Sequence, residues 1–324
     1  MQIPAFLCID VEPDEFALPK RGPASWAGYD DMIRFTSELR SALGTAGASP
    51  RFVWALRMDP QVAAVCGRAD YVVDAFANHM AMLSDAGDVF GLHVHPLRWS
   101  EHQGTWFHEF SDREWLADCA EASFATFADV FRTPPAIHRF GAQFLSNELV
   151  ALAERLGAQV DLTLEPGHGN PYRATKDVPM TGKCPNWIHS PRIPYRPLER
   201  DYREIDNRNG RGIVMMPLTA ARTRLDKPRW WRTARAVRRG GRRPLPLYLT
   251  RVWPSSQYFW DLVAAELDLM RTPYLALAVR TDHPGSVFAR RARGLLEHLP
   301  HHPLARRLRF LDPLGEAPAL LSTS

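Results

Sequence analysis

The chain has 324 residues, of which 45 % are hydrophobic and 23 % charged, a composition typical of a soluble globular protein. It contains no uninterrupted apolar stretch of about 18 residues, which excludes a membrane-spanning helix. The formal net charge of +4 is modest but uneven, because most of the basic excess lies in segments 227–244 and 289–310.

The segment 227–244, KPRWWRTARAVRRGGRRP, interleaves arginine with tryptophan. Such a segment could contact phosphate, nucleic acid or an anionic membrane surface, or it could be the solvated face of an arginine-rich chain. Because no nucleic-acid-binding motif accompanies it, we expect a solvated face and no nucleic-acid partner. Peripheral contact with a membrane stays open.

The start of the chain and its cysteines both indicate a compartment. MQIPAFLCID has neither a basic leader nor a small-residue cleavage site, so we expect no signal peptide. The cysteines are scattered without a C-x-x-C spacing, and Cys8 and Cys119 fall within apolar patterns. We therefore expect reduced cysteines and a cytoplasmic protein.

The first half of the chain alternates strand patterns with helix patterns. Short apolar runs typical of buried strands lie at 3–9, 51–56, 89–95, 135–140 and 158–164. Apolar residues at helical spacing lie between them, at 29–43, 71–87, 112–131 and 147–157. Successive β-α units of this kind predict a parallel sheet with helices outside it.

The second half begins with an irregular insertion at about 166–210, rich in Pro, Gly, Asn and Arg. Strand patterns return at 212–219, 246–252 and 272–279, with a helix at 256–270. At least seven strands without a linker predict one α/β domain over residues 1–310, a β/α barrel or a variant of one. A doubly wound open sheet is the main alternative. We expect one or two closing helices in 285–310 and a tail at 311–324.

Polar residues follow the predicted strands at their carboxyl ends, where the working residues of β/α folds gather. They are Asp10, Glu12 and Asp14 after the first strand, Arg57 and Asp59 after the second, His93 and His95 on the third, His138 and Arg139 on the fourth, and Arg280, Asp282 and His283 after a later one. Clusters after five strands predict one site at a single rim.

His93 and His95 are separated by one residue, so both imidazoles point to the same face of a strand. Two imidazoles and one carboxylate are a ligand set that zinc accepts, with a further position left for water. Asp10 and Glu12 also share a face, so one can bind metal while the other accepts a proton. A single histidine in such a position is more often structural. The histidine pair and the acid pair together predict a bound divalent metal ion, with zinc as the preferred ion.

Five blocks of the sequence resemble, in order and spacing, the polysaccharide deacetylases, which are the NodB-homology proteins of carbohydrate esterase family 4. The blocks are CIDVEPD, RFVWALRMDP, GLHVHP, IHRFGAQFLSNELVALAERLGAQVDLTLEP and YLALAVRTDH. The resemblance covers roughly residues 3–165 and 245–283. It implies an irregular seven-stranded (β/α) barrel with a divalent metal at its mouth. It also implies hydrolytic removal of an acetyl group, from an amide or an ester, on a sugar or sugar-containing metabolite.

The resemblance also implies roles for individual residues. The chain departs from the family pattern in four places. Val11 separates acids that are adjacent in the family, and the histidines are two rather than four apart. RFGAQ lacks the usual proline, and VRTDH fits the late Leu-x-x-His block poorly. We further expect Arg57 and Trp99 to contact substrate, Trp99 by stacking on a sugar ring. Carried over by position, Asp10 is the catalytic base, Glu12, His93 and His95 are the metal ligands, Arg139 orients the base, and His283, or else Asp282, is the general acid.

Two alternatives stay open at this stage. A metal-independent glycoside hydrolase could use Asp10 with Asp14 or Asp59 as paired carboxylates, which leaves the two histidines unexplained. A non-catalytic member of the deacetylase fold could bind a glycan. In the favoured interpretation the partner is an acetylated sugar or glycoconjugate, such as a nucleotide-linked or lipid-linked sugar.

Overall fold

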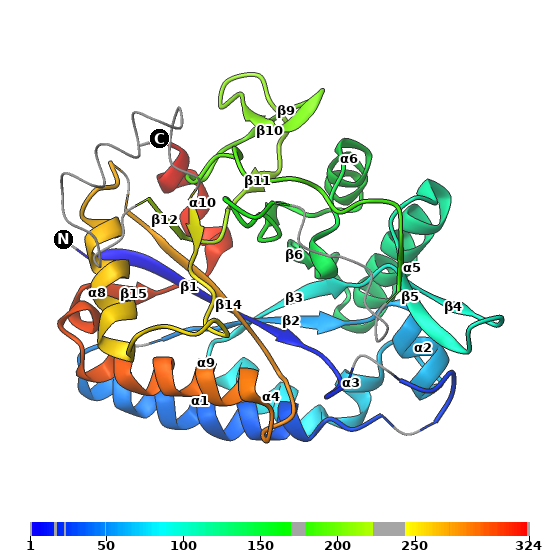
Figure 1. Ribbon diagram of the computed structural model, residues 1–324, viewed down its shortest axis with the longest axis horizontal. Helices are drawn as coiled ribbons and strands as arrows, with labels where there is room; N and C mark the ends of the chain where they lie inside the picture. Colours follow the sequence, from blue (N-terminus) through cyan, green and yellow to red (C-terminus); the bar gives the residue numbers. More distant parts are fainter. Residues whose placement is uncertain are drawn as a thin grey trace.

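The protein is built around one curled parallel sheet, with most helices on its outer side (Figure 1). The computed structural model describes residues 2–15, 18–22, 24–48, 50–169, 179–222, 244–271 and 273–322. Seven strands follow one another across the sheet in the order β11-β7-β6-β3-β2-β1-β14. Their bounds are β1 (Ile3–Val11), β2 (Val53–Arg57), β3 (Val89–Val94), β6 (Ile137–Phe140), β7 (Val160–Asp161), β11 (Val214–Met215) and β14 (Leu275–Arg280).

The two edges of this sheet curl toward each other. The Thr219 amide, just past β11, donates to the Ala276 carbonyl of β14 at 2.8 Å, and the Ala276 amide donates to Thr219 Oγ1 at 2.9 Å. Strands β1, β2, β3, β6, β7 and β11 lie side by side in chain order, without the reversal that a doubly wound sheet requires. The predicted irregular seven-stranded (β/α) barrel is therefore confirmed.

The helices bury the faces that their apolar spacing predicts. In α5, for example, Leu116, Ala120, Phe124 and Phe127 are buried. Figure 1 shows α1 and α9 along one outer side of the sheet, where Arg293 of α9 contacts Asp31 of α1 at 2.8 Å. The helices are α1 (Ala27–Thr45), α2 (Pro60–Cys66), α3 (Tyr71–Ala75), α4 (Ala77–Asp85), α5 (Arg113–Phe131), α6 (Asn147–Arg155), α8 (Ser256–Leu267), α9 (Val287–His298) and α10 (Pro313–Ser322), with 3₁₀ turns η1 (Gly141–Gln143), η2 (Leu299–His301) and η3 (Pro303–Arg307).

Strand alternation gives the sheet two apolar faces and fixes where the polar residues point. In β1, Leu7 and Ile9 pack outward against the helices, whereas Phe6 and Cys8 belong to a separate cluster inside the barrel. Because side chains alternate along a strand, Asp10 and Glu12 continue the inward series of Phe6 and Cys8. The carboxyl end of β1 therefore delivers two acids to the barrel interior.

The expected insertion contains only short pieces of regular structure in its described part. Within 166–210, β8 (Met180–Thr181) joins β4 (Leu97–Ser100) and β5 (Thr105–Glu109) in one small sheet, and β9 (Pro197–Leu198) pairs with β10 (Asp201–Ile205) in another. A third small sheet, outside this range, pairs β12 (Ala220–Ala221) with β13 (Leu245–Pro246).

Two expectations about the second half are wrong. The predicted strand 246–252 is not formed, because regular pairing stops at Pro246, whose ring nitrogen has no hydrogen to donate. Residues 311–324, expected as a tail, contain α10, which buries Ala317 and Leu320 in the cluster inside the barrel. The preceding residues form β15 (Leu308–Phe310), which adds to β1.

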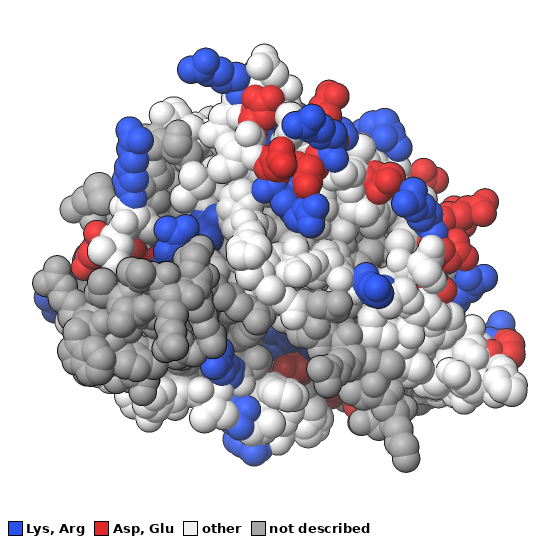
Figure 2. Space-filling model, turned by 45° about the horizontal axis from the view of Figure 1, so that its top comes forward, with Lys and Arg blue, Asp and Glu red and all other residues white. Residues whose placement is uncertain are grey.

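The sequence also leads us to expect a solvated basic segment at 227–244 and no membrane-spanning helix. On the face drawn in Figure 2, basic and acidic side chains of the described residues are intermixed. The basic segment 227–244 lies outside the described residues, apart from Pro244. Within the described parts of the chain, no helix combines the length and the hydropathy needed to cross a bilayer.

Candidate active site

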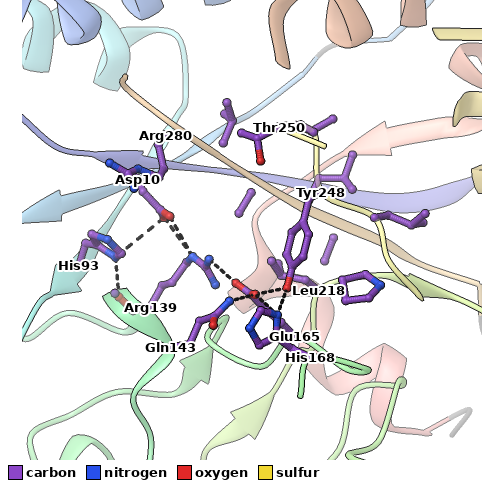
Figure 3. Close-up of a pocket in the computed structure, with 18 of the residues that line it drawn as sticks. Asp10, His93, Arg139, Gln143, Glu165, His168, Leu218, Tyr248, Thr250 and Arg280 are labelled. Carbon is purple, nitrogen blue, oxygen red and sulfur yellow. Dashed lines mark hydrogen bonds and ion pairs between the residues drawn. The ribbon is translucent and has the colours of Figure 1, made fainter. Parts of the chain in front are cut away.

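A cavity of about 350 Å³ opens among the carboxyl ends of the barrel strands. Its polar lining comes from β1, β3, β6 and β14 on one side and from segments near residues 143, 165 and 248 on the other (Figure 3). Its remaining lining is mostly apolar or small and includes Leu218, Ala276 and Ala278. The polar lining residues are Asp10, Glu12, His93, His95, Arg139, Gln143, Glu165, His168, Thr219, Tyr248, Thr250 and Arg280.

Three of these side chains direct their ligand atoms to one point. Glu12 Oε1 lies 3.3 Å from His93 Nε2 and 3.4 Å from His95 Nε2, and the two Nε2 atoms are 3.0 Å apart. A tetrahedral zinc ion with bonds of 2.0–2.1 Å would hold such atoms about 3.3–3.4 Å apart. All three residues are buried, and they form a group that could hold a metal ion. The spacing and the donor set therefore fit a divalent metal.

The His93 imidazole is held by a backbone carbonyl on the side away from this point, and His95 is anchored through its own amide. His93 Nδ1 lies 2.7 Å from the Arg139 carbonyl oxygen, so Nδ1 carries the proton and Nε2 keeps its lone pair. The His95 amide donates to Asp59 Oδ2 at 3.1 Å. Burial holds the pKa of His95 well below its ordinary value of 6.5. The His93 ring therefore turns Nε2 toward this point, and the His95 ring is neutral there.

Glu12 is kept ionised by its neighbours. Burial alone would raise its pKa, but the Arg280 guanidinium and the two histidines outweigh burial and hold the pKa well below the ordinary value. Arg280 Nε lies 3.3 Å from Oε1, and Arg57 Nη1 lies 3.4 Å from Oε2. A carboxylate rather than a carboxylic acid thus faces the two rings.

Asp10 lies beside this cluster and is held by Arg139. Arg139 Nε donates to both oxygens of Asp10 at 3.1 Å, and Nη2 of the same guanidinium donates to Glu165 Oε1 at 2.8 Å. Burial lowers the pKa of Arg139, but Asp10 and Glu165 raise it well above the ordinary value. Asp10 Oδ1 is 3.9 Å from His93 Nδ1. The guanidinium therefore fixes Asp10 beside Glu12, His93 and His95, which we call the metal-type cluster, and outside that group.

A second polar group on the opposite wall was not predicted. The Tyr248 hydroxyl donates to Glu165 Oε2 at 2.6 Å, and His168 Nδ1 lies 2.5 Å from the same hydroxyl. Gln143 Nε2 also donates to Glu165 Oε2. Glu165 stands near the end of a predicted strand, so the rule that found the other acids could have found it. Tyr248 carries no comparable signal in the sequence.

The structure places three of the predicted site residues outside the cavity. Arg57 is buried beneath Glu12 and forms a salt bridge with Asp59. Trp99 of β4 packs edge-on against Trp106 with ring centroids 5.4 Å apart. His283 is exposed, and its Nδ1 accepts the Gly285 amide at 3.0 Å. The predicted strand-end residues that line the cavity are Asp10, Glu12, His93, His95, Arg139 and Arg280.

Two further strand-end residues have local structural contacts. His138 lies on the face of β6 opposite to Arg139, 3.0 Å from Asp161. Asp14 accepts the Gly28 amide at 2.7 Å and the Ser25 hydroxyl at 2.5 Å, where the chain enters α1. These contacts agree with the simpler interpretation of each residue.

Comparison with solved structures identifies the fold. A protein from Parabacteroides distasonis described as a glycoside hydrolase/deacetylase superposes with a TM-score of 0.51 at 14 % identity, covering 95 % of this chain and 69 % of that one. Proteins described as polysaccharide deacetylases from Mycobacterium smegmatis and Pseudomonas aeruginosa both give TM-scores of 0.48, at 11 % and 8 % identity. They cover 99 % and 98 % of this chain and 91 % and 90 % of their own.

No protein-family model and no curated protein matches the sequence. At identities this low, the likeness of the solved structures identifies the fold alone. That fold is the irregular (β/α) barrel that the sequence blocks predict.

Proposed function

We propose that this protein is a metal-dependent hydrolase that removes an acetyl group, from an amide or an ester, on a sugar or sugar-containing metabolite. The observation that carries the proposal is the convergence of Glu12, His93 and His95 on one point, with Asp10 beside them in the same cavity. The barrel type supports the same reaction class.

Glu12, His93 and His95 would hold the ion, with zinc favoured by the donor set. A divalent ion bound there supplies Lewis-acid chemistry, since it acidifies water and polarises an acetyl carbonyl. Asp10 would accept the proton of the attacking water as general base. Arg139 orients Asp10 through its two Nε contacts.

The proton must then reach the departing amine or alcohol. Because His283 lies outside the cavity and is exposed, we assign this step to Asp10 as well. The carboxyl group would take one proton from water and pass the same proton to the leaving group, which leaves Asp10 ionised for the next cycle. This replaces the expectation that His283 is the general acid.

The cavity also bears on the size of the substrate. Its volume of about 350 Å³ is near the lower limit for small-molecule sites. Asp10, Glu12, His93 and His95 are each at most 3 % exposed. This favours a single acetylated sugar unit or a chain end over the middle of a polymer. We place the reaction in the cytoplasm, where the four free cysteines would stay reduced.

The test is acetate release from a panel of acetylated monosaccharides, oligosaccharides and nucleotide-linked sugars, with metal analysis of the same sample. We expect about one divalent ion per chain, activity that a chelator removes and zinc restores, and preference for the small substrates. Acetate release that survives complete metal removal would favour a metal-independent deacetylation, and glycosidic cleavage without acetate release would favour a glycoside hydrolase. Sugar binding without metal or acetate release would favour a glycan-binding protein.

A further inference from the structure

The loop that follows β6 approaches the metal-type cluster at one glycine. A Cβ atom added to Gly141 would lie 2.1 Å from Nε2, 2.2 Å from Cδ2 and 2.6 Å from Cε1 of His95. Distances below 3.0 Å are essentially never seen for real Cβ atoms. The contact involves Nε2, the His95 atom that faces Glu12 and His93.

Backbone conformation does not explain this glycine. Gly141 does not have a φ in the left-handed region, whereas the next two residues, Ala142 and Gln143, have φ values of 51° and 59° without being glycines. A residue with a side chain could therefore adopt the Gly141 backbone. What the position requires is space for a neighbouring ring.

Neither side of the contact is free to move away. The Phe140 amide donates to Thr163 Oγ1 at 2.9 Å, and the Arg139 carbonyl accepts from His93, which anchors the chain just before Gly141. The His95 ring lies edge-on to His93, with centroids 4.8 Å apart, and 6.1 Å from the His108 ring. A methyl group at position 141 would therefore displace the His95 imidazole.

We propose that Gly141 is a positioning residue for the metal site, because the missing Cβ provides the space in which the His95 imidazole reaches Glu12 and His93. The proposal rests on the proposed metal cluster, and it assigns a role to a residue that has no side chain with which to bind a metal. It also links two features of the sequence, the H-x-H pair on β3 and the glycine two residues after Arg139.

The first experiment measures zinc affinity of Gly141→Ala by competition with a chromophoric chelator. We expect affinity to fall by at least about 10-fold, the lower end of what loss of ligand support costs. Gly44→Ala in α1 is the matched control, because a Cβ there meets no atom within 4 Å, and its affinity should equal that of the parent. Parental affinity in Gly141→Ala would overturn the proposal.

A second experiment uses the metal-free protein, so that it does not depend on the proposed function. We expect Gly141→Ala to lower the melting temperature of the parent but to have much less effect in His95→Ala, where the ring is absent. If Gly141→Ala fails to fold alone, the double variant should fold. Equal destabilisation in both backgrounds, or two variants that both fail to fold, would overturn the proposal. If the parent binds no zinc, the proposed function is wrong. The second experiment would still test the contact between position 141 and the His95 ring, because it needs no metal.

Discussion

The two walls of the cavity hold their side chains in different ways. On one wall, Asp10 and His93 project inward from the parallel strands β1 and β3, which flank β2, and Glu12 directly follows β1; each contacts another charged or ring group. On the other wall, Tyr248 comes from a segment with no regular strand pairing beyond Pro246. Sheet geometry thus fixes the chemistry of the first wall, whereas irregular backbone shapes the space beside it.

This difference predicts which wall should tolerate substitutions without loss of metal binding. A displaced ligand on the strand wall cannot be replaced, because the neighbouring strands are in fixed register. A changed side chain on the irregular wall alters the shape of the cavity and the support of Glu165, while the metal-type cluster keeps its own contacts. Variants of the two walls should therefore differ in what they lose.

The largest effect is expected from His93→Ala and His95→Ala. Each removes one of the three proposed ligand atoms, so both variants should lose stoichiometric metal and, with it, acetate release. Elemental analysis of the purified variants checks this, with the exposed His102→Ala as a control that keeps its metal. Full occupancy in both ligand variants would mean that the two histidines are structural.

Asp10→Asn should separate catalysis from metal binding. The amide keeps the size of the side chain but cannot accept the proton of water, so kcat should fall by about 10²–10⁴. Metal content should stay at the parental value, because the ligand atoms belong to Glu12 and the two histidines. A metal-free Asp10→Asn would show that this residue is a principal ligand instead.

Arg139→Lys tests how the strand wall orients its base. A lysine ammonium cannot contact Asp10 and Glu165 through separate nitrogens as the guanidinium does. We expect kcat to fall by about 10- to 100-fold, a loss usual for a supporting contact, with metal retained. The control adds Arg139→Lys to Asp10→Asn, where the carboxylate is already absent. If kcat falls as much in that background as in the parent, Arg139 does not act through Asp10.

Tyr248→Phe is the matching test on the irregular wall. It removes the hydroxyl that donates to Glu165 and keeps the ring that shapes the cavity. We expect a loss of unfolding free energy of about 1–3 kcal/mol, because a buried carboxylate loses one donor. Metal content should be unchanged and kcat should fall by less than about 10-fold. A metal-free Tyr248→Phe would mean that the two walls are not independent.

The same contrast explains which parts could be predicted from sequence. Asp10 and His93 lie on β1 and β3, and Glu12 and His95 directly follow these strands, so strand alternation predicts that each pair shares a face. Tyr248, on a segment without regular pairing, is brought to Glu165 by tertiary folding that no periodicity records. Likewise, α10 packs Ala317 and Leu320 against the apolar cluster inside the barrel. The local sequence pattern of 311–324 did not predict this helix.

The smallest effect is expected from His283→Ala. Sequence position made His283 the nearest candidate for the general acid, but its side chain is exposed and its Nδ1 accepts the Gly285 amide in a local turn. If Asp10 both takes and returns the proton, kcat and KM should change by less than about twofold, since distant surface changes rarely matter. The acidic and basic limbs of the pH–rate profile should also be unchanged. A loss of about 10² or more in kcat, with metal retained, would return the acid role to His283 and would require the loop after β14 to bring it to the cavity.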